Sequence, residues 1–326
     1  MEYLVFETGG TKLVAGVAGG DCRIIETSIA LREPGDRAEK SFQRLLEAGR
    51  DLKRRHQKLG HALRAIGFGF GGIVRRSTRD PFLCLHEEGW ENLQVVETLE
   101  KEFGRPVFVE NDCKLAALAE AHFGAGKDHR TVFYMTIGTG VGGGIVTDGR
   151  IQAMSDLGEA EIGHIVVMPG GPPCWCGGRG CVEAVCSGPG MTQLAAWMAR
   201  QDSRAWGQSA LAKTYASADK ASSKDLLEAW ESGDVFAQDV VEASAGYLAS
   251  AVAAAINLIS PEVFVIGGGV GTGNQRFLAL VSEKARGRVV AYFRDHCQIV
   301  PSALREQVVT QGAAILAAQL SGHAVR

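Results

Sequence analysis

One short stretch of the chain carries side chains that bind metal ions. His164 is followed by nine residues and then Cys174, Cys176 and, after four more residues, Cys181. One imidazole and three thiolates complete a tetrahedral zinc shell, and a closed shell is typical of a structural ion. The segments between the ligands are rich in glycine and proline, so the ion would act as a cross-link in place of a core. Reduced cysteines without a metal are the alternative.

The remaining cysteines lie apart from this cluster and are expected to be small buried residues. They are Cys22, Cys84, Cys113, Cys186 and Cys297.

Glycine turns are the second feature that could take part in ligand binding, since 42 of the 326 residues are glycine. Gly67–Gly72 and Gly138–Gly143 both satisfy G-x-G-x-x-G, but the residues after each look extended, so no helix N-terminus is there to hold a pyrophosphate. This excludes a dinucleotide fold, and no P-loop motif is present. A Gly-Thr turn between strands can still direct backbone N–H groups at a phosphate. An ordinary tight hairpin is the alternative for any one such turn.

The opening turn recurs 128 residues later in the chain. Gly10, Thr11 and Gly16 match Gly138, Thr139 and Gly144 in a pattern of strand, Gly-Thr turn and strand. The repeat predicts two related α/β domains that face one another across a cleft. A third turn, Gly267–Gly269, follows the expected strand Val263–Ile266, at the strand end where open α/β sheets bind ligands.

Hydrophobic periodicity indicates the elements that position these residues. Strands are expected at Val5–Thr8, Leu13–Val17, Ile24–Leu31, Ala65–Phe70 and Pro106–Glu110. Helices are expected at Arg37–Lys58, Leu93–Phe103, Asp112–Phe123 and Phe236–Ile259. The third helix is expected to end at Gly124 with a left-handed cap. Linker-like residues 124–128 then divide a smaller domain, 1–124, from a larger domain, 125–305, that carries the loop 164–181.

Composition excludes several classes of protein. With 34 basic and 37 acidic residues, the net charge of −3 provides no excess of cations for a nucleic acid. The longest apolar segment, Tyr247–Ile259, is interrupted by Ser250 and Asn257, which favours a buried helix over a membrane span. The first residues lack the zones of a signal peptide, so we expect a cytoplasmic protein.

These residues together resemble the ROK family of sugar kinases and repressors, within the actin and hexokinase-like superfamily. The matching segments are Glu7–Lys12, Glu110–Asp112, Gly138–Gly144, Glu161–His164, Cys174–Glu183, Gly267–Gly269 and Gly312–Ala314. The resemblance implies two ribonuclease H-like (actin-like ATPase) domains, with a C-terminal helix near 306–326 that packs back on the smaller one. It also implies a homodimer.

The resemblance assigns Asp112 as the base that takes the proton of a sugar 6-hydroxyl as this attacks the γ-phosphate of ATP. By itself, an aspartate that opens a helix is more often a cap. The implied sugar-binding positions are Gly72, Asn111, Asp112, Glu161, His164 and Glu183. The implied positions around Mg²⁺ and ATP are Glu7, Gly9, Gly10, Thr11, Lys12, Gly138, Thr139, Gly140, Ser187, Gly188, Gly268 and Gly269.

Some of these positions have simpler explanations. Glu161 and Glu183 taken alone are typical of solvated surface charge, and Trp90, which matches a recurring Trp-x-Asn with Asn92, is equally a packed indole. His164 would use one ring nitrogen for zinc and the other for the sugar.

Four positions depart from the family pattern. Glu7 stands where aspartate is usual, Gly71 replaces a customary proline, Arg75 stands where Asp or Asn is commoner, and Lys114 replaces an asparagine. The last three border the expected sugar pocket.

We therefore predict an ATP- and Mg²⁺-dependent hexokinase that acts on glucose. An N-acetylglucosamine, N-acetylmannosamine or fructose kinase, or a non-catalytic sugar-binding relative, is the alternative. A repressor is disfavoured because family repressors carry a helix-turn-helix segment ahead of the first glycine turn, and here only eight residues precede Gly9.

Overall fold

The computed structural model describes residues 1–10, 12–33, 35–84, 87–305 and 307–323. The chain forms two compact units. Unit 1 contains Met1–Arg130, Gly144–Glu159 and Leu304–Arg326, and unit 2 contains Thr131–Gly143 and Ala160–Ala303. The chain thus passes from one unit to the other four times along its length.

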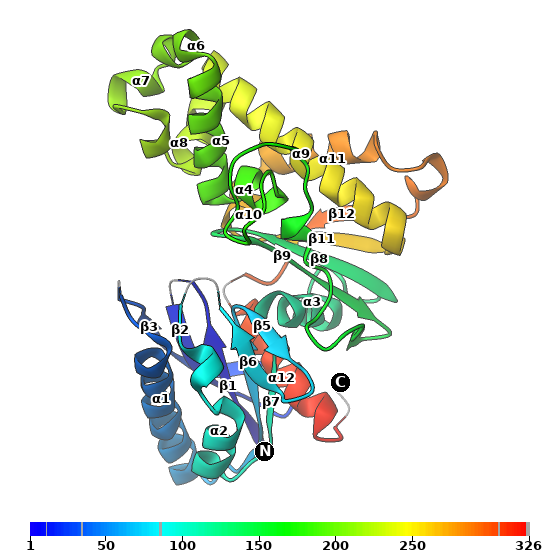
Figure 1. Ribbon diagram of the computed structural model, residues 1–326. Helices are drawn as coiled ribbons and strands as arrows, with labels where there is room; N and C mark the ends of the chain where they lie inside the picture. Colours follow the sequence, from blue (N-terminus) through cyan, green and yellow to red (C-terminus); the bar gives the residue numbers. More distant parts are fainter. Residues whose placement is uncertain (11, 34, 85–86, 306, 324–326) are drawn as a thin grey trace. The chain divides into compact units, whose positions relative to one another are not determined.

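Unit 1 is built on a five-stranded sheet with the strand order β3-β2-β1-β4-β7 (Figure 1). Its strands are β1 (Glu2–Thr8), β2 (Lys12–Ala18), β3 (Ile24–Leu31), β4 (Leu63–Phe70) and β7 (Val107–Asn111). The first three are antiparallel, whereas β4 and β7 run parallel to β1. A small hairpin of β5 (Ile73–Arg75) and β6 (Asp80–Leu83) follows β4.

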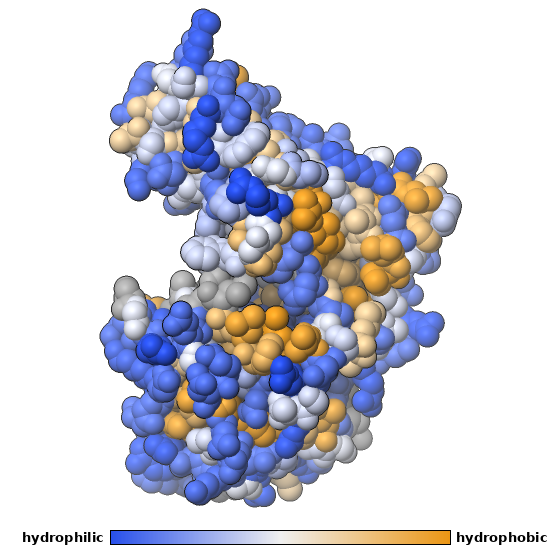
Figure 2. All heavy atoms as spheres, in the orientation of Figure 1, coloured by the Kyte–Doolittle hydropathy of each residue, from blue (hydrophilic) through white to orange (hydrophobic). Residues whose placement is uncertain are grey.

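Helices pack against this sheet. They are α1 (Ala38–Lys58), α2 (Val95–Phe103), α3 (Asp112–Phe123) and α12 (Val308–Leu320), with a 3₁₀ turn, η1 (Trp90–Asn92). α1 buries Phe42, Leu45 and Leu52, and Figure 2 shows its outer side as mostly hydrophilic. α12 contacts β1, β4 and α3. It approaches β4 so closely that a methyl group on Gly67 would lie 2.1 Å from the carbonyl oxygen of Ala313.

The second sheet repeats the first, with the order β10-β9-β8-β11-β12. Its strands are β8 (Thr131–Ile137), β9 (Val141–Thr147), β10 (Arg150–Ile151), β11 (Val263–Gly267) and β12 (Gln298–Pro301). Here too β11 is parallel to β8 and β12 is parallel to β11. The internal repeat predicted from the two Gly-Thr turns is confirmed, because each turn joins the equivalent pair of strands.

The helices of unit 2 lie between β10 and β12 in the sequence. They are α4 (Val182–Cys186), α5 (Gly188–Gln201), α6 (Ser203–Gln208), α7 (Leu211–Thr214), α8 (Ser223–Glu231), α9 (Val235–Ile259), α10 (Gly269–Gly273) and α11 (Gln275–Arg286). The 3₁₀ turns are η2 (Ile162–His164), η3 (Ala218–Lys220) and η4 (Ala291–Phe293). Among the described residues, α9 alone is long and apolar enough to cross a membrane, and 61% of its most apolar stretch is buried. α9 has the burial expected of a core helix.

Three expectations differ from the structure. α3 does end before Gly124, but this residue is not left-handed: its φ is −112° and its ψ is −147°. Glycine is needed there for space, because a methyl group would lie 2.0 Å from Oε2 of Glu120, which accepts the N–H of Ala125. Residues 144–159, expected in the larger domain, group with unit 1. Cys84 and Cys113 are only half-buried.

Candidate active site

The first glycine turn of unit 1 places a buried carboxylate at the end of β1. The N–H of Gly9 donates to the carbonyl oxygen of Lys12 at 2.9 Å, which closes the turn around Gly10; Thr11 lies outside the described residues. Glu7 is 5% exposed, and its Oε1 lies 3.6 Å from Nζ of Lys12. Its Oε2 has no hydrogen-bond partner among the described atoms. Burial raises the pKa of Glu7 to about 7, and the nearby Asp112 carboxylate adds to the rise.

Asp112 is the first residue of α3, directly after β7. Its Oδ1 accepts the N–H of Cys113 at 2.8 Å. Its Oδ2 faces the turn after β4, at 3.6 Å from the position of a methyl group on Gly71. That methyl group would lie 2.7 Å from the carbonyl oxygen of Thr8. Glycine at position 71 thus lets three chain segments meet around the carboxylate.

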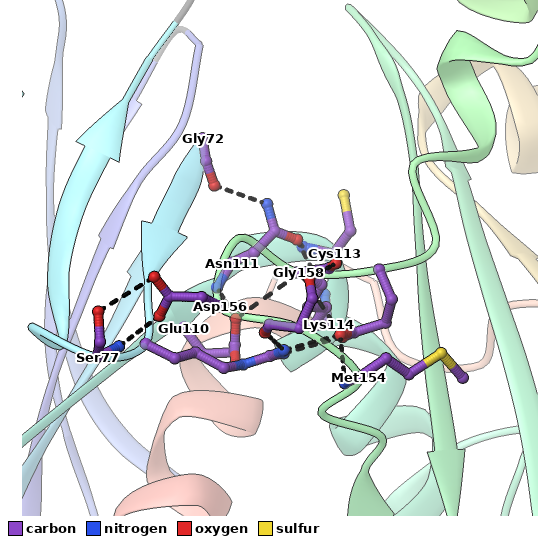
Figure 3. A network of polar contacts seen from close by, with 12 residues as sticks. Gly72, Ser77, Glu110, Asn111, Cys113, Lys114, Met154, Asp156 and Gly158 are labelled. Atoms are coloured by element: carbon purple, nitrogen blue, oxygen red, sulfur yellow. Dashed lines mark hydrogen bonds and ion pairs between the residues drawn. The ribbon is translucent and has the colours of Figure 1, made fainter.

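Asn111 fixes the start of the same helix. Its Oδ1 accepts the N–H groups of Cys113 at 3.0 Å and Lys114 at 3.2 Å, so it is the N-cap of α3. Its Nδ2 donates to the carbonyl oxygen of Gly72 at 3.0 Å (Figure 3). The amide therefore orients both the helix that carries Asp112 and the strand end after β4.

Two residues that depart from the family pattern point to partners inside unit 1. The guanidinium of Arg75 lies 4.0 Å from the ring centre of Phe82, within the β5–β6 hairpin. Lys114 is 3% exposed on its side chain and lies near Glu110 and Glu159. Trp90 is fully buried and donates to Glu87 at 2.6 Å, so its indole packs in the core.

The glycine turns of unit 2 line a hollow of about 570 Å³. It is lined by Gly138, Thr139, Gly188, Pro189, Thr192, Ser222, Ser223, Gly269 and Val270. Four of these are predicted nucleotide positions, and a second hollow of about 700 Å³ shares Ser223, Gly269 and Val270 with it. The two hollows give unit 2 a continuous recess between the β8–β9 turn and α11.

Backbone hydrogen bonds shape this recess. The N–H of Gly188 donates to the carbonyl oxygen of Gly138 at 2.8 Å, and Ser187 caps α5 by accepting the N–H of Gly190. Gly268 has a φ of +81°, and a side chain there would lie 2.4 Å from the carbonyl oxygen of Ile137. Only glycine meets both constraints.

Glu183 supports the same turn. Its Oε2 accepts the N–H of Val141 at 3.0 Å and would lie 2.6 Å from a methyl group on Gly140. The carboxylate thus contacts the Gly138–Gly140 turn directly. Glu161 is exposed and lies just before η2, next to Ala160, a left-handed residue with φ of 61°.

His164, Cys174, Cys176 and Cys181 form a cluster of four potential metal ligands. Their ligand atoms all lie within 4.8 Å of one another. Nδ1 of His164 is 3.6 Å from Sγ of Cys174, and the sulfur atoms of Cys176 and Cys181 are 3.7 Å apart. In a tetrahedral site with bonds of about 2.3 Å to sulfur and about 2.0 Å to nitrogen, a nitrogen and a sulfur ligand lie about 3.6 Å apart and two sulfur ligands about 3.8 Å apart. The His164–Cys174 and Cys176–Cys181 separations match these values.

Comparison with known proteins identifies the family of the chain. Residues 3–320 match the ROK family. The chain belongs to the ROK family. It is 32% identical over 316 residues to the glucokinase of Thermotoga maritima, with 96% of each chain covered. It is 27% identical over 268 residues to the transcriptional repressor Mlc of Escherichia coli, covering 80% of this chain and 62% of the repressor.

A solved ROK structure extends the similarity to the fold. The ROK glucokinase of Streptomyces griseus, in complex with glucose and AMPPNP, is 30% identical and has a TM-score of 0.79. The match covers 98% of this chain and 100% of the other.

Several recess residues carry no motif and are absent from the sequence predictions. Pro189 and Thr192 follow the predicted Ser187-Gly188, whereas Ser222 and Ser223 open α8 far along the chain. Ser222 and Asp225 form a capping box, which is a sequence signal for a helix start but not for a ligand.

Proposed function

We propose that this ROK protein is an ATP-dependent hexokinase that transfers the γ-phosphate of ATP to the 6-hydroxyl of glucose. The observation that carries the proposal is Asp112, held at the start of α3 by its own helix N–H and bordered by the Gly71 turn. The glucokinase relatives, similar over nearly the whole chain, support glucose as the acceptor.

Asp112 would act as the general base. The N–H of Cys113 fixes one carboxylate oxygen, and the other oxygen is the one to accept the hydroxyl proton. As the proton leaves, the sugar oxygen gains the charge needed to attack the phosphorus. Asn111 and the backbone around Gly72 would hold the sugar in line.

Glu7 suits a site beside phosphate and Mg²⁺. Its buried Oε2 has no partner among the described atoms, and a buried carboxylate oxygen is a good ligand for a hard cation. When bound, Mg²⁺ neutralises phosphate charge as the bond to the leaving ADP breaks. The N–H group of Gly10, in the turn next to Glu7, would add a hydrogen bond to a phosphate oxygen.

The recess of unit 2 would hold the nucleoside. Gly188 and Gly269 line it with little side-chain bulk, and Arg276 lies at its far end with its guanidinium over Trp230. Its combined size suits a nucleotide-sized ligand.

We also propose that the four-ligand site holds structural zinc, because three thiolates and one imidazole favour zinc over harder cations. Since Nδ1 of His164 faces Cys174, Nε2 is the ring nitrogen left for a sugar hydroxyl. We further propose a homodimer, which the resemblance implies, and a cytoplasmic location. Light scattering of the purified protein tests the first.

The test is a sugar panel with ATP, in which ADP release is measured for glucose, fructose, mannose, N-acetylglucosamine and N-acetylmannosamine. We expect glucose to give the highest kcat/KM. Asp112→Asn should lower kcat by about 10²–10⁴-fold while glucose still binds, because only proton transfer is lost. If no sugar drives ADP release, and the variant and parent bind sugar alike, the protein is a non-catalytic sugar-binding protein.

A further inference from the structure

Four charged side chains form a cluster beside the start of α3, within unit 1. They are Arg76, Glu110, Lys114 and Glu159, of which Figure 3 labels Glu110 and Lys114. Arg76 makes a two-pronged contact with Glu159, with Nη1 to Oε2 at 2.8 Å and Nη2 to Oε1 at 2.9 Å. The same Nη2 donates to Glu110 at 3.2 Å. Nζ of Lys114 lies 3.7 Å from Glu159 and 3.9 Å from Glu110. Two cations thus hold two carboxylates, and the cluster is neutral.

This cluster is costly to bury. The side chain of Lys114 is 3% exposed and that of Glu159 is 5% exposed. Burial is the largest single influence on the pKa of Glu159 and raises it, but the hydrogen bonds from Arg76 and from the N–H of Met154, with the charges of Lys114 and Arg76, together keep the pKa below its usual range. Buried ion pairs add little net stability over apolar side chains of the same size. The cluster therefore calls for an explanation other than stability.

One carboxylate of the cluster is attached to a proposed sugar ligand. Glu110 directly precedes Asn111, and its Oε1 accepts the N–H of Asn111 at 2.9 Å. Asn111 in turn caps α3 and contacts the carbonyl oxygen of Gly72. A shift of Glu110 would therefore move both the sugar-binding amide and the helix that begins with Asp112.

The other carboxylate fastens the segment that leads to a second sugar ligand. Glu159 accepts the N–H of Met154 at 3.1 Å, and Arg76 donates to the carbonyl oxygen of Ser155 at 2.8 Å. Nearby, Asp156 accepts the N–H of Ser77 at 2.7 Å (Figure 3). Residues 154–159 are thus fixed to the β5–β6 hairpin, and Glu161 follows two residues later.

The fit around the lysine is close. Gly158 has a φ of +106°, and a methyl group there would lie 2.2 Å from Nζ of Lys114. The backbone of residue 158 therefore passes directly over the ammonium group. After Glu159, the left-handed Ala160 turns the chain toward Glu161.

We propose that Arg76 and Lys114 are positioning residues for the hexose, because they hold Glu110, which accepts the N–H of Asn111, and Glu159, which fastens residues 154–159. This inference rests on the proposed sugar kinase function. It predicts a particular signature: loss of the cluster weakens the use of the sugar and leaves the use of ATP unchanged. Lys114, which replaces an asparagine of the family pattern, thus acts through Glu110 and Glu159 and does not itself contact the sugar.

The experiment compares Lys114→Met with the double variant Lys114→Met/Glu159→Gln. The single variant keeps the volume but leaves a buried net charge, whereas the double variant restores neutrality. We expect both to raise the KM for glucose by about tenfold or more, with the KM for ATP within twofold of the parent. Thermal unfolding should show the single variant destabilised and the double variant close to the parent. Lys40→Met is the matched control. It removes a lysine of α1 whose Nζ lies 2.9 Å from Asp36, and it should leave both KM values unchanged.

A purely structural role predicts a different result. If the double variant has both the stability and the glucose KM of the parent, the proposal is wrong. Hydrogen exchange on the parent tests the proposal even if both variants fail to fold: glucose should slow exchange in peptides that cover 154–159, and unchanged exchange would overturn it. A parent that phosphorylates glucose while the variants keep its KM refutes the positioning role alone. A parent that neither binds nor phosphorylates any sugar refutes both proposals.

Discussion

Glu7 makes the sharpest quantitative prediction, because its carboxyl is buried and one oxygen has no partner among the described atoms. Replacing it by glutamine removes a charge without changing the side chain's shape. Burial raises the pKa of Glu7 from 4.5 to about 7. At about 1.4 kcal/mol per pKa unit, this difference corresponds to about 3 kcal/mol of unfavourable free energy when the group is ionised in the folded state.

The sign follows from linkage. Since the folded pKa is raised, stabilisation by the protonated carboxyl is fully present below about pH 4.5 and is lost as the pH rises through about 7. Glu7→Gln should therefore increase the free energy of unfolding by about 3 kcal/mol at pH 8 and by only about 1 kcal/mol at pH 5. Urea denaturation at both pH values measures it.

The same substitution should lower activity, since the neutral amide is a poorer ligand for a cation beside phosphate. Glu102→Gln is the control: this half-exposed carboxylate pairs with Arg50 at 2.7 Å, and its loss should cost less than about 1 kcal/mol. The reasoning is refuted if the Glu7→Gln protein is less stable than the parent at pH 8, or if its increase in the free energy of unfolding is the same at both pH values.

Two other perturbations test the metal site and the packing of unit 2. Purified protein should contain one zinc per chain, and Cys176→Ser should lower both the zinc content and the thermal midpoint; a folded parent with far less than one equivalent contradicts the ligand assignment. Gly163→Ala should destabilise the protein by about 1–3 kcal/mol or more, because the new methyl group would lie 1.9 Å from the carbonyl oxygen of Val141. Gly207→Ala, which meets no atom within 4 Å in α6, should have a small effect of the opposite sign, and equal effects would contradict the packing argument.

Features that depend on local sequence were predictable. The metal ligands lie within eighteen positions of one another, so their spacing alone indicates the site. The repeat of Gly10 at Gly138 is visible because a tight turn requires the same residue type in both places. The extended residues predicted after the two G-x-G-x-x-G segments are confirmed as well, since β5 follows Gly67–Gly72 and β9 begins within Gly138–Gly143.

Features that depend on distant residues were not predictable. Lys114 meets Glu159 across 45 positions of sequence, and Arg76 meets it across 83. Neither pair forms a motif, so the sequence places Lys114 at the border of the sugar pocket from its position two residues after Asp112. Ser222 and Ser223 escape prediction as residues of the recess because only the fold brings them beside Gly138 and Gly269, which are distant in sequence.

The four passages of the chain between the units have a consequence for synthesis on the ribosome. Unit 1 requires α12, which packs on β1, β4 and α3, yet α12 is translated after every residue of unit 2. The apolar face of the unit 1 sheet that α12 covers therefore stays exposed until nearly the whole polypeptide has been synthesised. All residues of unit 2 are synthesised before α12. A truncation that removes about the last twenty residues would therefore prevent unit 1, which is synthesised first, from completing its fold.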